Sequence, residues 1–338
     1  MEPIVPFFPP VKFDLGFLEV HGFGIMVGVG LWFGTNMAMD KAKRDGLDPD
    51  IINRVVTWMI VGIFVGGHLG HALFYEPHKL VEGPALTESL PNWTYIFRVW
   101  DGLSSFGGFI VTAFLCWLFF KKENKRVKSK NKTRQKDPNK KLLFPVRPTH
   151  YGDCVIYGFP MAFGLGRVGC FMAHDHPGLP SDFWLAVPGI CQDSRTPAVD
   201  GVCPSGWTFE AGSSFSADYC YNTQVACHDL GLYEAIWACS LIPIVRYLDK
   251  KKARFQGFFL AFIPMYYAPF RIYFDTLRTN DVKYYGFTPA QYGAMILFGI
   301  GFGLFLWLRK TTSVRELTAK SDAIPYDPEE FEEKQKKA

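Results

Sequence analysis

The sequence predicts an all-α membrane protein that crosses the bilayer seven times. Of its 338 residues, 49% are hydrophobic and 17% are aromatic, a composition too apolar and too aromatic for an ordinary soluble domain. Seven stretches are apolar over roughly the length of a membrane-spanning helix. Positive charge gathers in every second connecting segment, as it does in polytopic membrane proteins. These three observations define the fold class.

The predicted spans form one membrane domain over residues 1–310, which carries a small extracytoplasmic head and is followed by a polar cytoplasmic tail at 311–338. The third and fifth spans are short, so their ends are the least well defined. The spans, in chain order, are Leu15–Met39, Ile52–Phe74, Gly107–Phe120, Tyr151–Ala173, Leu230–Val245, Gly257–Phe274 and Thr288–Leu308.

The charge of the connecting segments predicts the orientation. The positive-inside rule places the basic segments in the cytoplasm, so the N-terminus lies outside and the C-terminus inside. The first 14 residues lack a basic start and an apolar core, so no cleavable signal peptide is expected. The cytoplasmic loop at 121–150 is expected to be mobile and to contact anionic lipid. The basic positions are Lys41–Arg54, Lys121–Lys141, Arg246–Arg254 and Arg309-Lys310.

Four of the eight cysteines lie in one segment between the fourth and fifth spans, the insertion at 179–227. This segment is rich in Gly, Ser and Pro and is predicted to face the oxidising side of the membrane, where such cysteines form disulfides. Two bridges are expected, and three pairings are open. Zinc is disfavoured because the spacings lack close pairs of ligands. The four cysteines are Cys191, Cys203, Cys220 and Cys227.

Two arginines lie inside apolar runs, Arg167 in the fourth span and Arg271 in the sixth. A charge near the bilayer centre costs roughly 2.5–3.5 kcal/mol on insertion scales, so such residues usually face a polar cavity. The sequence therefore predicts an anion site. The structural alternative is an arginine that pairs with a carboxylate at a helix end and holds two segments together. Glycine-rich helix faces around Gly66, Gly67 and Gly164 are expected to admit lipid chains.

The sixth span carries further polar groups at helical spacing. Tyr267, Arg271, Asp275 and Arg278 recur every three or four positions and so share one helix face. Two guanidinium groups with a phenol and a built-in carboxylate are suited to holding a phosphate. The alternative is a ladder of Arg–Asp pairs at the membrane surface.

Several segments resemble the signature motifs of the prolipoprotein diacylglyceryl transferases. The family pattern G-R-x-G-N-F-x-N-x-E-x-x-G aligns with Gly166–Gly178, and H-P-S-Q-L-Y-E aligns with His228–Glu234. The pattern Y-x-x-F-R-x-x-x-E-x-x-R aligns with Tyr267–Arg278. Further matches, in family order and extending the resemblance over about residues 15–310, are His21–Met26, Phe64–Tyr75 and Arg98–Gly102.

The resemblance implies transfer of a diacylglyceryl group from phosphatidylglycerol to the lipobox cysteine thiol of prolipoproteins, with release of glycerol phosphate. It implies a protein of the bacterial cytoplasmic (inner) membrane. Its partners are phosphatidylglycerol, membrane lipid and prolipoprotein signal peptides, with no nucleic acid, cofactor or metal. The residues that the resemblance assigns to catalysis are Arg167, Arg271, Glu234 and Tyr267. Those assigned to substrate binding are Arg167, Arg271, Arg278, Asp275, Tyr233, His21 and Asp175.

One departure from the family concerns the base. The family motif S-F-H-G-G, whose histidine is a candidate for thiol activation, reads Ser104-Ser105-Phe106-Gly107-Gly108 here. Phe106 cannot accept a proton, although we expect it to face the cavity at the helix entrance. Histidine titrates near neutral pH, so His68 and His71, which share a helix face, are candidates for a relocated base.

Other departures leave a second reading open. Cys170 and Ala173 replace the two signature asparagines, Asp175 replaces the glutamate, and Phe23 replaces a tyrosine of the first span. A catalytically impaired paralogue that binds lipid or lipoproteins would tolerate these changes. The retained arginines favour the enzyme, because drift should erode charges that are costly to insert. A transporter is disfavoured, since the spans show no evident inverted repeat.

Overall fold

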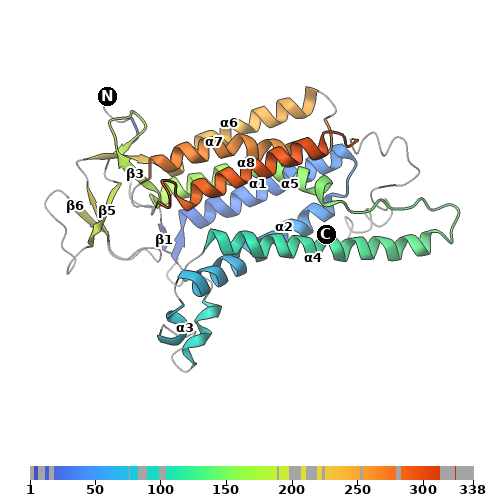
Figure 1. The fold of residues 1–338 in the computed structure, drawn as a ribbon, viewed down its shortest axis with the longest axis horizontal. Coiled ribbons are helices and arrows are strands. Elements are labelled where there is room, and N and C mark those ends of the chain that lie inside the picture. The colour runs from blue at the N-terminus through green and yellow to red at the C-terminus, as the bar shows by residue number, and fades with distance from the viewer. Residues whose placement is uncertain are drawn as a thin grey trace. The chain divides into compact units, whose positions relative to one another are not determined.

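The computed structural model describes residues 4–6, 12–14, 19–75, 77–82, 90–98, 104–188, 190–197, 207–210, 219–222, 225–251, 254–278, 283–312 and 324. Within these ranges the chain forms seven long helices, three short ones and eight short strands (Figure 1). It divides into two compact units, one made of residues 1–41 and 152–313 and the other of residues 42–151 and 314–338.

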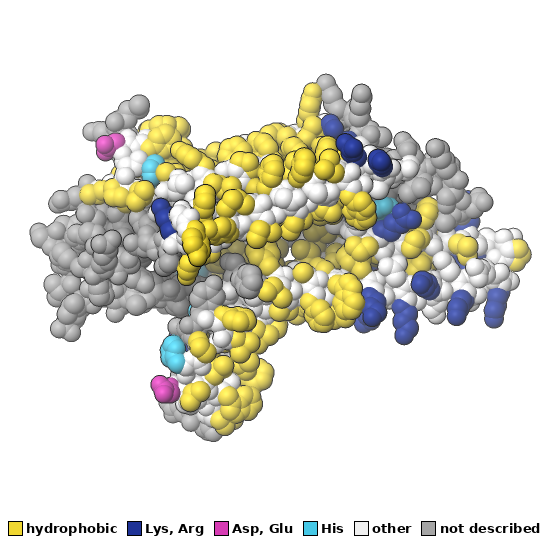
Figure 2. All heavy atoms as spheres, in the orientation of Figure 1, with side chains coloured by type: hydrophobic (Ala, Val, Ile, Leu, Met, Phe, Trp, Pro, Cys, Tyr) yellow, Lys and Arg dark blue, Asp and Glu magenta, His cyan; other side chains and the backbone are white. Residues whose placement is uncertain are grey.

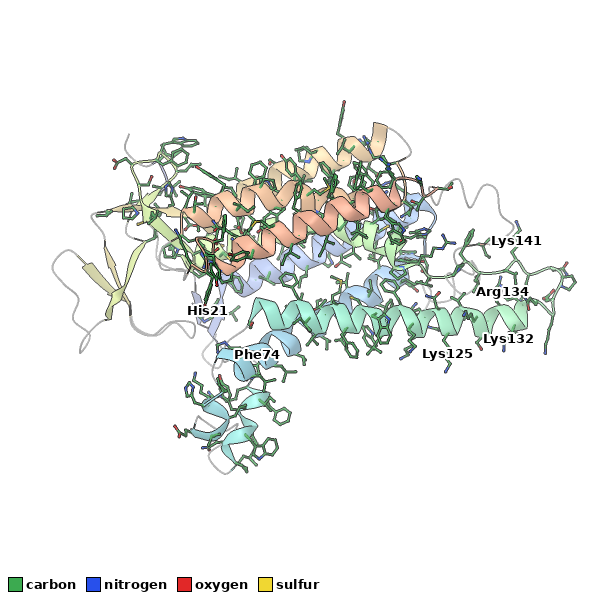
Figure 3. All side chains as sticks on the ribbon, viewed as in Figure 1. His21, Phe74, Lys125, Lys132, Arg134 and Lys141 are labelled. Atoms are coloured by element: carbon green, nitrogen blue, oxygen red, sulfur yellow. The ribbon has the colours of Figure 1, made fainter. Side chains whose placement is uncertain are left out.

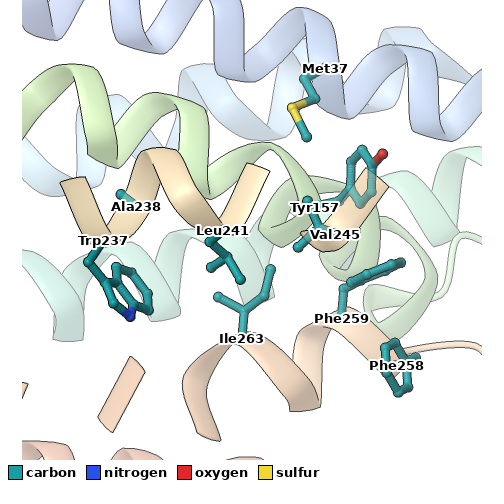
Figure 4. Close-up of a cluster of buried hydrophobic side chains, with 9 residues drawn as sticks. All are labelled: Met37, Tyr157, Trp237, Ala238, Leu241, Val245, Phe258, Phe259 and Ile263. Atoms are coloured by element: carbon teal, nitrogen blue, oxygen red, sulfur yellow. The ribbon is translucent and has the colours of Figure 1, made fainter. Parts of the chain in front are cut away.

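The long helices of the first unit are joined by an apolar core. Trp237 and Leu241 of α6 meet Phe259 and Ile263 of α7 in this core, and Tyr157 of α5 completes it (Figure 4). Small residues bring α1 and α5 together, because a Cβ added at Gly34 would lie 2.9 Å from a carbonyl oxygen of α5. The helices are α1 (Gly22–Asp45, whose last turn belongs to the second unit), α5 (Pro148–Ala173), α6 (Leu230–Lys251), α7 (Phe258–Thr276) and α8 (Pro289–Leu308).

Short strands fill much of the segment between α5 and α6, so the chain is mostly rather than entirely helical. The strands β3, β8 and β4 form one antiparallel sheet in that order, and β5, β7 and β6 form another. A further hairpin pairs β1 with β2 and places Lys12 opposite His21. The strands are β1 (Lys12–Asp14), β2 (Glu19–His21), β3 (Pro177–Pro180), β4 (Val187–Pro188), β5 (Cys191–Pro197), β6 (Trp207–Glu210), β7 (Tyr219–Asn222) and β8 (Ala226–Asp229).

The second unit is built on the close packing of α2 (Pro49–Gly70) against α4 (Ser105–Arg134). A Cβ added at Gly66 would lie 2.6 Å from the carbonyl oxygen of Gly107, so only glycine fits there. Gly66 therefore serves helix packing, and the expectation that the glycine-rich faces admit lipid chains stays a prediction. The short helices of this unit are η1 (His71–Tyr75), α3 (Lys79–Glu82) and η2 (Asn92–Phe97).

Residues 121–134 continue α4 as one helix, where the sequence predicted the start of a mobile loop. Lys, Arg and Glu are good helix formers, and no Gly or Pro interrupts the helix before Pro138. Two asparagines on α4 hold the following extended segment. Asn124 bonds both backbone groups of Val146 at 2.7 and 3.0 Å, and Asn131 does the same for Leu143 at 2.8 and 2.9 Å. The connection is thus ordered by side-chain hydrogen bonds.

Each of the seven predicted spans coincides with a long helix, although several boundaries differ. The first helix begins at Gly22 rather than Leu15, because Glu19–His21 pairs in a hairpin. The third reaches Arg134 and the fifth reaches Lys251. Four helical stretches among the described residues are long and apolar enough to cross a membrane: Gly22–Asp45, Pro49–Phe74, Pro148–Ala173 and Pro289–Leu308. The seven crossings and their orientation stay predictions.

The described cysteines comprise four free thiols within helices and one disulfide-bonded cysteine in the insertion. Those within helices, Cys116, Cys154, Cys170 and Cys239, form no disulfide. Cys227 of β8 is buried and disulfide-bonded. The side chains of the other three cysteines of the insertion lie outside the described residues, so the number of bridges and their pairing stay predictions.

Candidate anion-binding site

Glycines at the end of α5 allow Arg167 to come close to its neighbours. A Cβ at Gly169 would lie 3.1 Å from backbone atoms of Phe23 on α1. At Gly164 it would lie 3.3 Å from side-chain atoms of Ala238 and Cys239 on α6. The small residues around Arg167 therefore pack α5 tightly between two helices, and the arginine projects from this packed position.

Glu234, in the first turns of α6, is the centre of the site and is fully buried. Arg167 Nε lies 2.5 Å from its Oε2 in an ion pair, and Arg271 Nη1 donates a hydrogen bond to its Oε1 at 2.7 Å. The hydroxyl of Tyr267 donates to the same Oε1 at 3.3 Å. One buried carboxylate thus holds two guanidinium groups from two different helices.

Three of the four residues of the predicted polar face lie on α7, whereas Arg278 lies two residues beyond the end of this helix. Asp275 is a second carboxylate on this face. The side chain of Asp275 is fully buried and lies 3.7 Å from Arg271 Nη2 and 3.7 Å from Arg278 Nη1. These distances describe ion pairs rather than hydrogen bonds. Its other oxygen accepts a hydrogen bond from the hydroxyl of Thr288, which caps α8. Asp275 therefore links Arg271 of α7, and Arg278 just beyond it, to the start of α8.

The buried carboxylates of this cluster are fewer than its guanidinium groups. The three guanidinium groups of Arg167, Arg271 and Arg278 face the two buried carboxylates of Glu234 and Asp275. Asp175, which is exposed and paired with His176, adds a third negative charge near Arg167. The arginine side chains keep 16, 17 and 29% of their surface exposed, whereas those of Glu234 and Asp275 are covered. An anion can therefore approach the guanidinium groups from the exposed side.

Glycine at position 178 places β3 against the end of α7. The amide of Leu179 donates to the carbonyl of Leu277 at 2.8 Å, and Gly178 forms a bridge with Arg278. A Cβ at Gly178 would lie 2.5 Å from that carbonyl oxygen. The last glycine of the signature motif is thus explained by this backbone contact beside Arg278.

The turn that leads into α6 is fixed by two further pairs. The buried His174 ring lies 3.3 Å from a carboxylate oxygen of Asp229, whose other oxygen accepts the amide of Leu232 and so caps α6. Nδ1 of His228 lies 2.8 Å from the hydroxyl of Tyr233, and burial lowers the pKa of His228. These contacts orient the turn that carries Glu234.

Three side chains near Arg167 are close enough to share a metal ion. The ligand atoms of Cys170, Asp175 and His176 all lie within 4.8 Å of one another. Arg167 Nη1 lies 3.7 Å from the Cys170 sulfur, and its positive charge opposes a cation there. Asp175 and His176 are also already paired at 2.5 Å. The sequence predicts no bound metal ion, and this stays a prediction.

The structure brings together most of the residues that the sequence assigned. Glu234 joins Arg167, Arg271 and Tyr267 directly, while Asp275 joins Arg271 and Arg278. Tyr233 pairs with His228, and Asp175 with His176, near the same helix ends. His21 closes β2 directly before α1.

The candidate bases belong to the second unit. His68 is buried, and its Nε2 lies 3.2 Å from the carbonyl oxygen of Tyr95, so this ring already has a structural role. His71 is half-buried at the start of η1. Phe106 lies in the first turn of α4, and its side chain is outside the described residues. A catalytic role for either histidine stays a prediction.

Three features of the site were not predicted from the sequence. Thr288 and Gln291 form a reciprocal capping box at the start of α8, and its T-x-x-Q signature is readable in Thr288–Gln291. The contact of Thr288 with Asp275 has no such signature. The His174–Asp229 pair likewise joins residues 55 positions apart and is visible only in three dimensions.

Apolar helices and a buried carboxylate that gathers arginines define a multi-helix membrane protein with a buried cluster of paired charges. The sequence model of the family "Prolipoprotein diacylglyceryl transferase" matches residues 10–307. The chain therefore belongs to the prolipoprotein diacylglyceryl transferase family.

Individual relatives agree with this assignment. The phosphatidylglycerol–prolipoprotein diacylglyceryl transferase of Chromohalobacter salexigens is 32% identical over 196 residues, which are 57% of this chain and 62% of that enzyme. The match with this relative thus spans less than two thirds of its length. The enzyme of the same name from Cronobacter sakazakii is 25% identical over 93% of this chain and 97% of its own. The enzyme of the same name from Citrobacter koseri is 27% identical over 83% of this chain and 84% of its own length.

Proposed function

We propose that this protein transfers the diacylglyceryl group of phosphatidylglycerol to the lipobox cysteine of prolipoproteins in the bacterial inner membrane. The observation that carries the proposal is the pairing of Arg167 and Arg271 on the buried Glu234, with Arg278 beside Asp275 and all three guanidinium groups partly exposed. Family membership and the names of the relatives support the same activity. The alternating charge of the connecting segments supports seven crossings with the N-terminus outside.

The reaction requires stabilisation of a leaving group. The cysteine sulfur bonds to the glycerol carbon that carried the phosphate, and the carbon–oxygen bond breaks with its electron pair on the phosphate oxygen. Glycerol phosphate leaves, and the thiol proton passes to water or to a base. Charge grows on the phosphate in this step, so fixed guanidinium groups stabilise the transition state more than the bound lipid. In this proposal Arg167, Arg271 and Arg278 provide that charge.

Glu234 and Asp275 act as positioning residues in this proposal. Each is buried and holds two arginines, so the guanidinium groups stay in place when no lipid is bound. Tyr267 adds a hydrogen bond to the same carboxylate. The structural alternative is that the arginines pair with a carboxylate only to join helices. Arg167 and Arg271 do join α5 and α7 to α6 through Glu234. The exposed guanidinium surface favours anion binding in addition to that role.

The experiment that tests this function is complementation of a strain depleted of its own transferase. We expect lipid-modified lipoprotein to reappear when this chain is expressed, detected as a mass increase of the lipoprotein. A vector without the gene and a chain carrying Glu234→Ala are the controls. If a stably inserted chain yields no modified lipoprotein in cells or with purified substrates, while still binding phosphatidylglycerol, the impaired paralogue is the correct reading.

The replacement of the family histidine by Phe106 favours the impaired paralogue, and the substitution Phe106→His tests whether that histidine is needed. Phe106→His should leave transfer unchanged or improve it, because a thiol of pKa about 8.5 is already a few per cent ionised at neutral pH. The measurement is the initial rate with purified prolipoprotein peptide. Loss of activity in His71→Ala with retained folding would show a relocated base. His68→Ala needs a folding control, because that ring is buried against η2.

The cysteines of the insertion at 179–227 should form two disulfides that order an extracytoplasmic cap. Digestion without reductant, followed by mass spectrometry, is expected to give two cross-linked peptide pairs from this segment. Cys116 and Cys239 serve as internal controls, because they form no disulfide and should alkylate under the same conditions. Four free thiols in the insertion would contradict the cap. Its expected role is to screen which precursors reach the site.

A further inference from the structure

The part of α4 beyond its apolar half is a strongly basic arm, defined here as residues 121–134. It carries eight Lys and Arg residues and one carboxylate, Glu123, which leaves a net charge of seven. Glu123 is buried and pairs with Arg54 at 2.7 Å, so it is not available to neutralise its basic neighbours. Figure 2 shows the Lys and Arg side chains gathered along this end of the molecule. The arm is thus a highly charged surface without an assigned role.

Several lysines of the arm lie on one exposed face. Lys121, Lys125, Lys128 and Lys132 are spaced by four, three and four residues and are all exposed. Figure 3 shows Lys125 and Lys132 projecting from the same side of the helix. Lys121 also lies 4.9 Å from the ring of Trp117, which marks the change from apolar to basic helix. A row of like charges repels itself, so an anionic partner would stabilise it.

The C-terminal tail is anchored to this unit at Ile324, close in sequence to a run of acidic residues. The extended segment that Asn131 and Asn124 hold against α4 also pairs with Ile324 of the C-terminal tail. Ile324 donates to Leu142 at 2.8 Å and accepts from the amide of Phe144 at 2.9 Å. Shortly after Ile324 the sequence carries five carboxylates within seven residues: Asp327, Glu329, Glu330, Glu332 and Glu333.

We infer that the acidic segment Asp327–Glu333 docks on the basic arm and neutralises it. An extended chain spans at most about 3.3–3.6 Å per residue, so the nine residues from Ile324 to Glu333 reach about 30 Å. The arm is fourteen residues long and therefore about 21 Å. All of its lysines are within reach. Tethering at Ile324 makes the interaction intramolecular, which favours it even where each charge pair contributes little.

Anionic lipid is a poorer match for the whole arm. The arm continues a helix whose apolar half ends at Phe120, so its distal lysines lie up to about 20 Å further along the helix axis. The Debye length is about 8 Å at physiological ionic strength, so a bilayer surface attracts chiefly the first turn or two. The acidic segment has no such limit, because its anchor pairs with residues held beside Asn131.

Zero-length carbodiimide cross-linking of the full-length protein in neutral-lipid nanodiscs tests this inference. We expect amide bonds between carboxylates of Asp327–Glu333 and lysines of the arm, mapped by mass spectrometry. Their yield should fall several-fold in about 1 M salt, where the Debye length is about 3 Å. The triple variant Lys125→Glu, Lys128→Glu, Lys132→Glu should lose them. Changing Lys334, Lys336 and Lys337 to Ala is the matched control and should not.

Charge exchange separates pairing from a loss of folding. Glu329, Glu330, Glu332 and Glu333 are changed to Lys in the triple arm variant, which should restore cross-links between the same two segments. Absence of cross-links in the native protein, or an equal yield in the arm variant alone, would overturn the inference. So would their disappearance when phosphatidylglycerol replaces the neutral lipid at constant ionic strength, because lipid would then occupy the arm.

Discussion

Replacement of Arg271 by Lys should lower kcat/KM for transfer about 10- to 100-fold while the protein still folds. Arg271 reaches two carboxylates at once, because Nη1 binds Glu234 at 2.7 Å and Nη2 faces Asp275 at 3.7 Å. A lysine is a single point charge and cannot keep both contacts and also face a phosphate. A hydrogen bond to a charged group contributes about 1.5–3 kcal/mol, which gives this range. Initial rates with phosphatidylglycerol and a prolipoprotein peptide measure the effect.

Arg167→Ala should have the larger effect, since it removes the guanidinium group altogether. Breaking a buried ion pair by removing one partner costs about 3–5 kcal/mol, so both stability and lipid binding should fall. Arg278→Ala is the matched control: Arg278 is more exposed than Arg167 and lies 3.7 Å from Asp275, whereas Arg167 lies 2.5 Å from Glu234. The loss of binding and transfer in Arg278→Ala should therefore be smaller. Unchanged phosphatidylglycerol binding and transfer in Arg167→Ala would refute the anion site.

The sequence predicted the helices better than their ends. Apolar runs locate a helix because burial in lipid requires them, and each predicted run overlaps a long helix. Run length does not reveal where a helix continues into water, so the basic extension to Arg134 was read as a loop. Asn124 and Asn131 hold the following segment against this extension, and their partners lie 22 and 12 residues away. Such contacts leave no periodic pattern.

The residues of the candidate site were predictable from the sequence, but the contacts between them were predictable only in part. The spacing of Tyr267, Arg271 and Asp275 placed them on one helix face, which the structure bears out. Spacing alone did not indicate that Arg167 and Arg271 would share Glu234, because those contacts join α5, α6 and α7. The alignment with the family motifs identified the residues, and the three-dimensional structure shows how their charges balance.

The motif that lost its histidine also kept two glycines, and the structure gives a reason that is independent of catalysis. Gly107 sits where α4 crosses α2, and a Cβ there would lie 2.6 Å from the Cα of Gly70 and would overlap the carbonyl oxygen of Gly66. Both obstacles are backbone atoms, so no rotamer change relieves them. At the neighbouring Gly108 the nearest atom, the carbonyl oxygen of Ile63, is 3.4 Å away.

Gly107→Ala should therefore destabilise the protein, and Gly108→Ala should have little effect. Overpacking typically costs about 1–3 kcal/mol, and a membrane helix pair that relies on close backbone contact should lie at the upper end. The thermal midpoint in detergent and the yield of inserted protein measure the difference between these adjacent substitutions. Equal stability of the two variants would show that α2 and α4 do not approach through Gly107. A selective loss in Gly107→Ala would mean that packing preserves the glycines even where the histidine has been replaced.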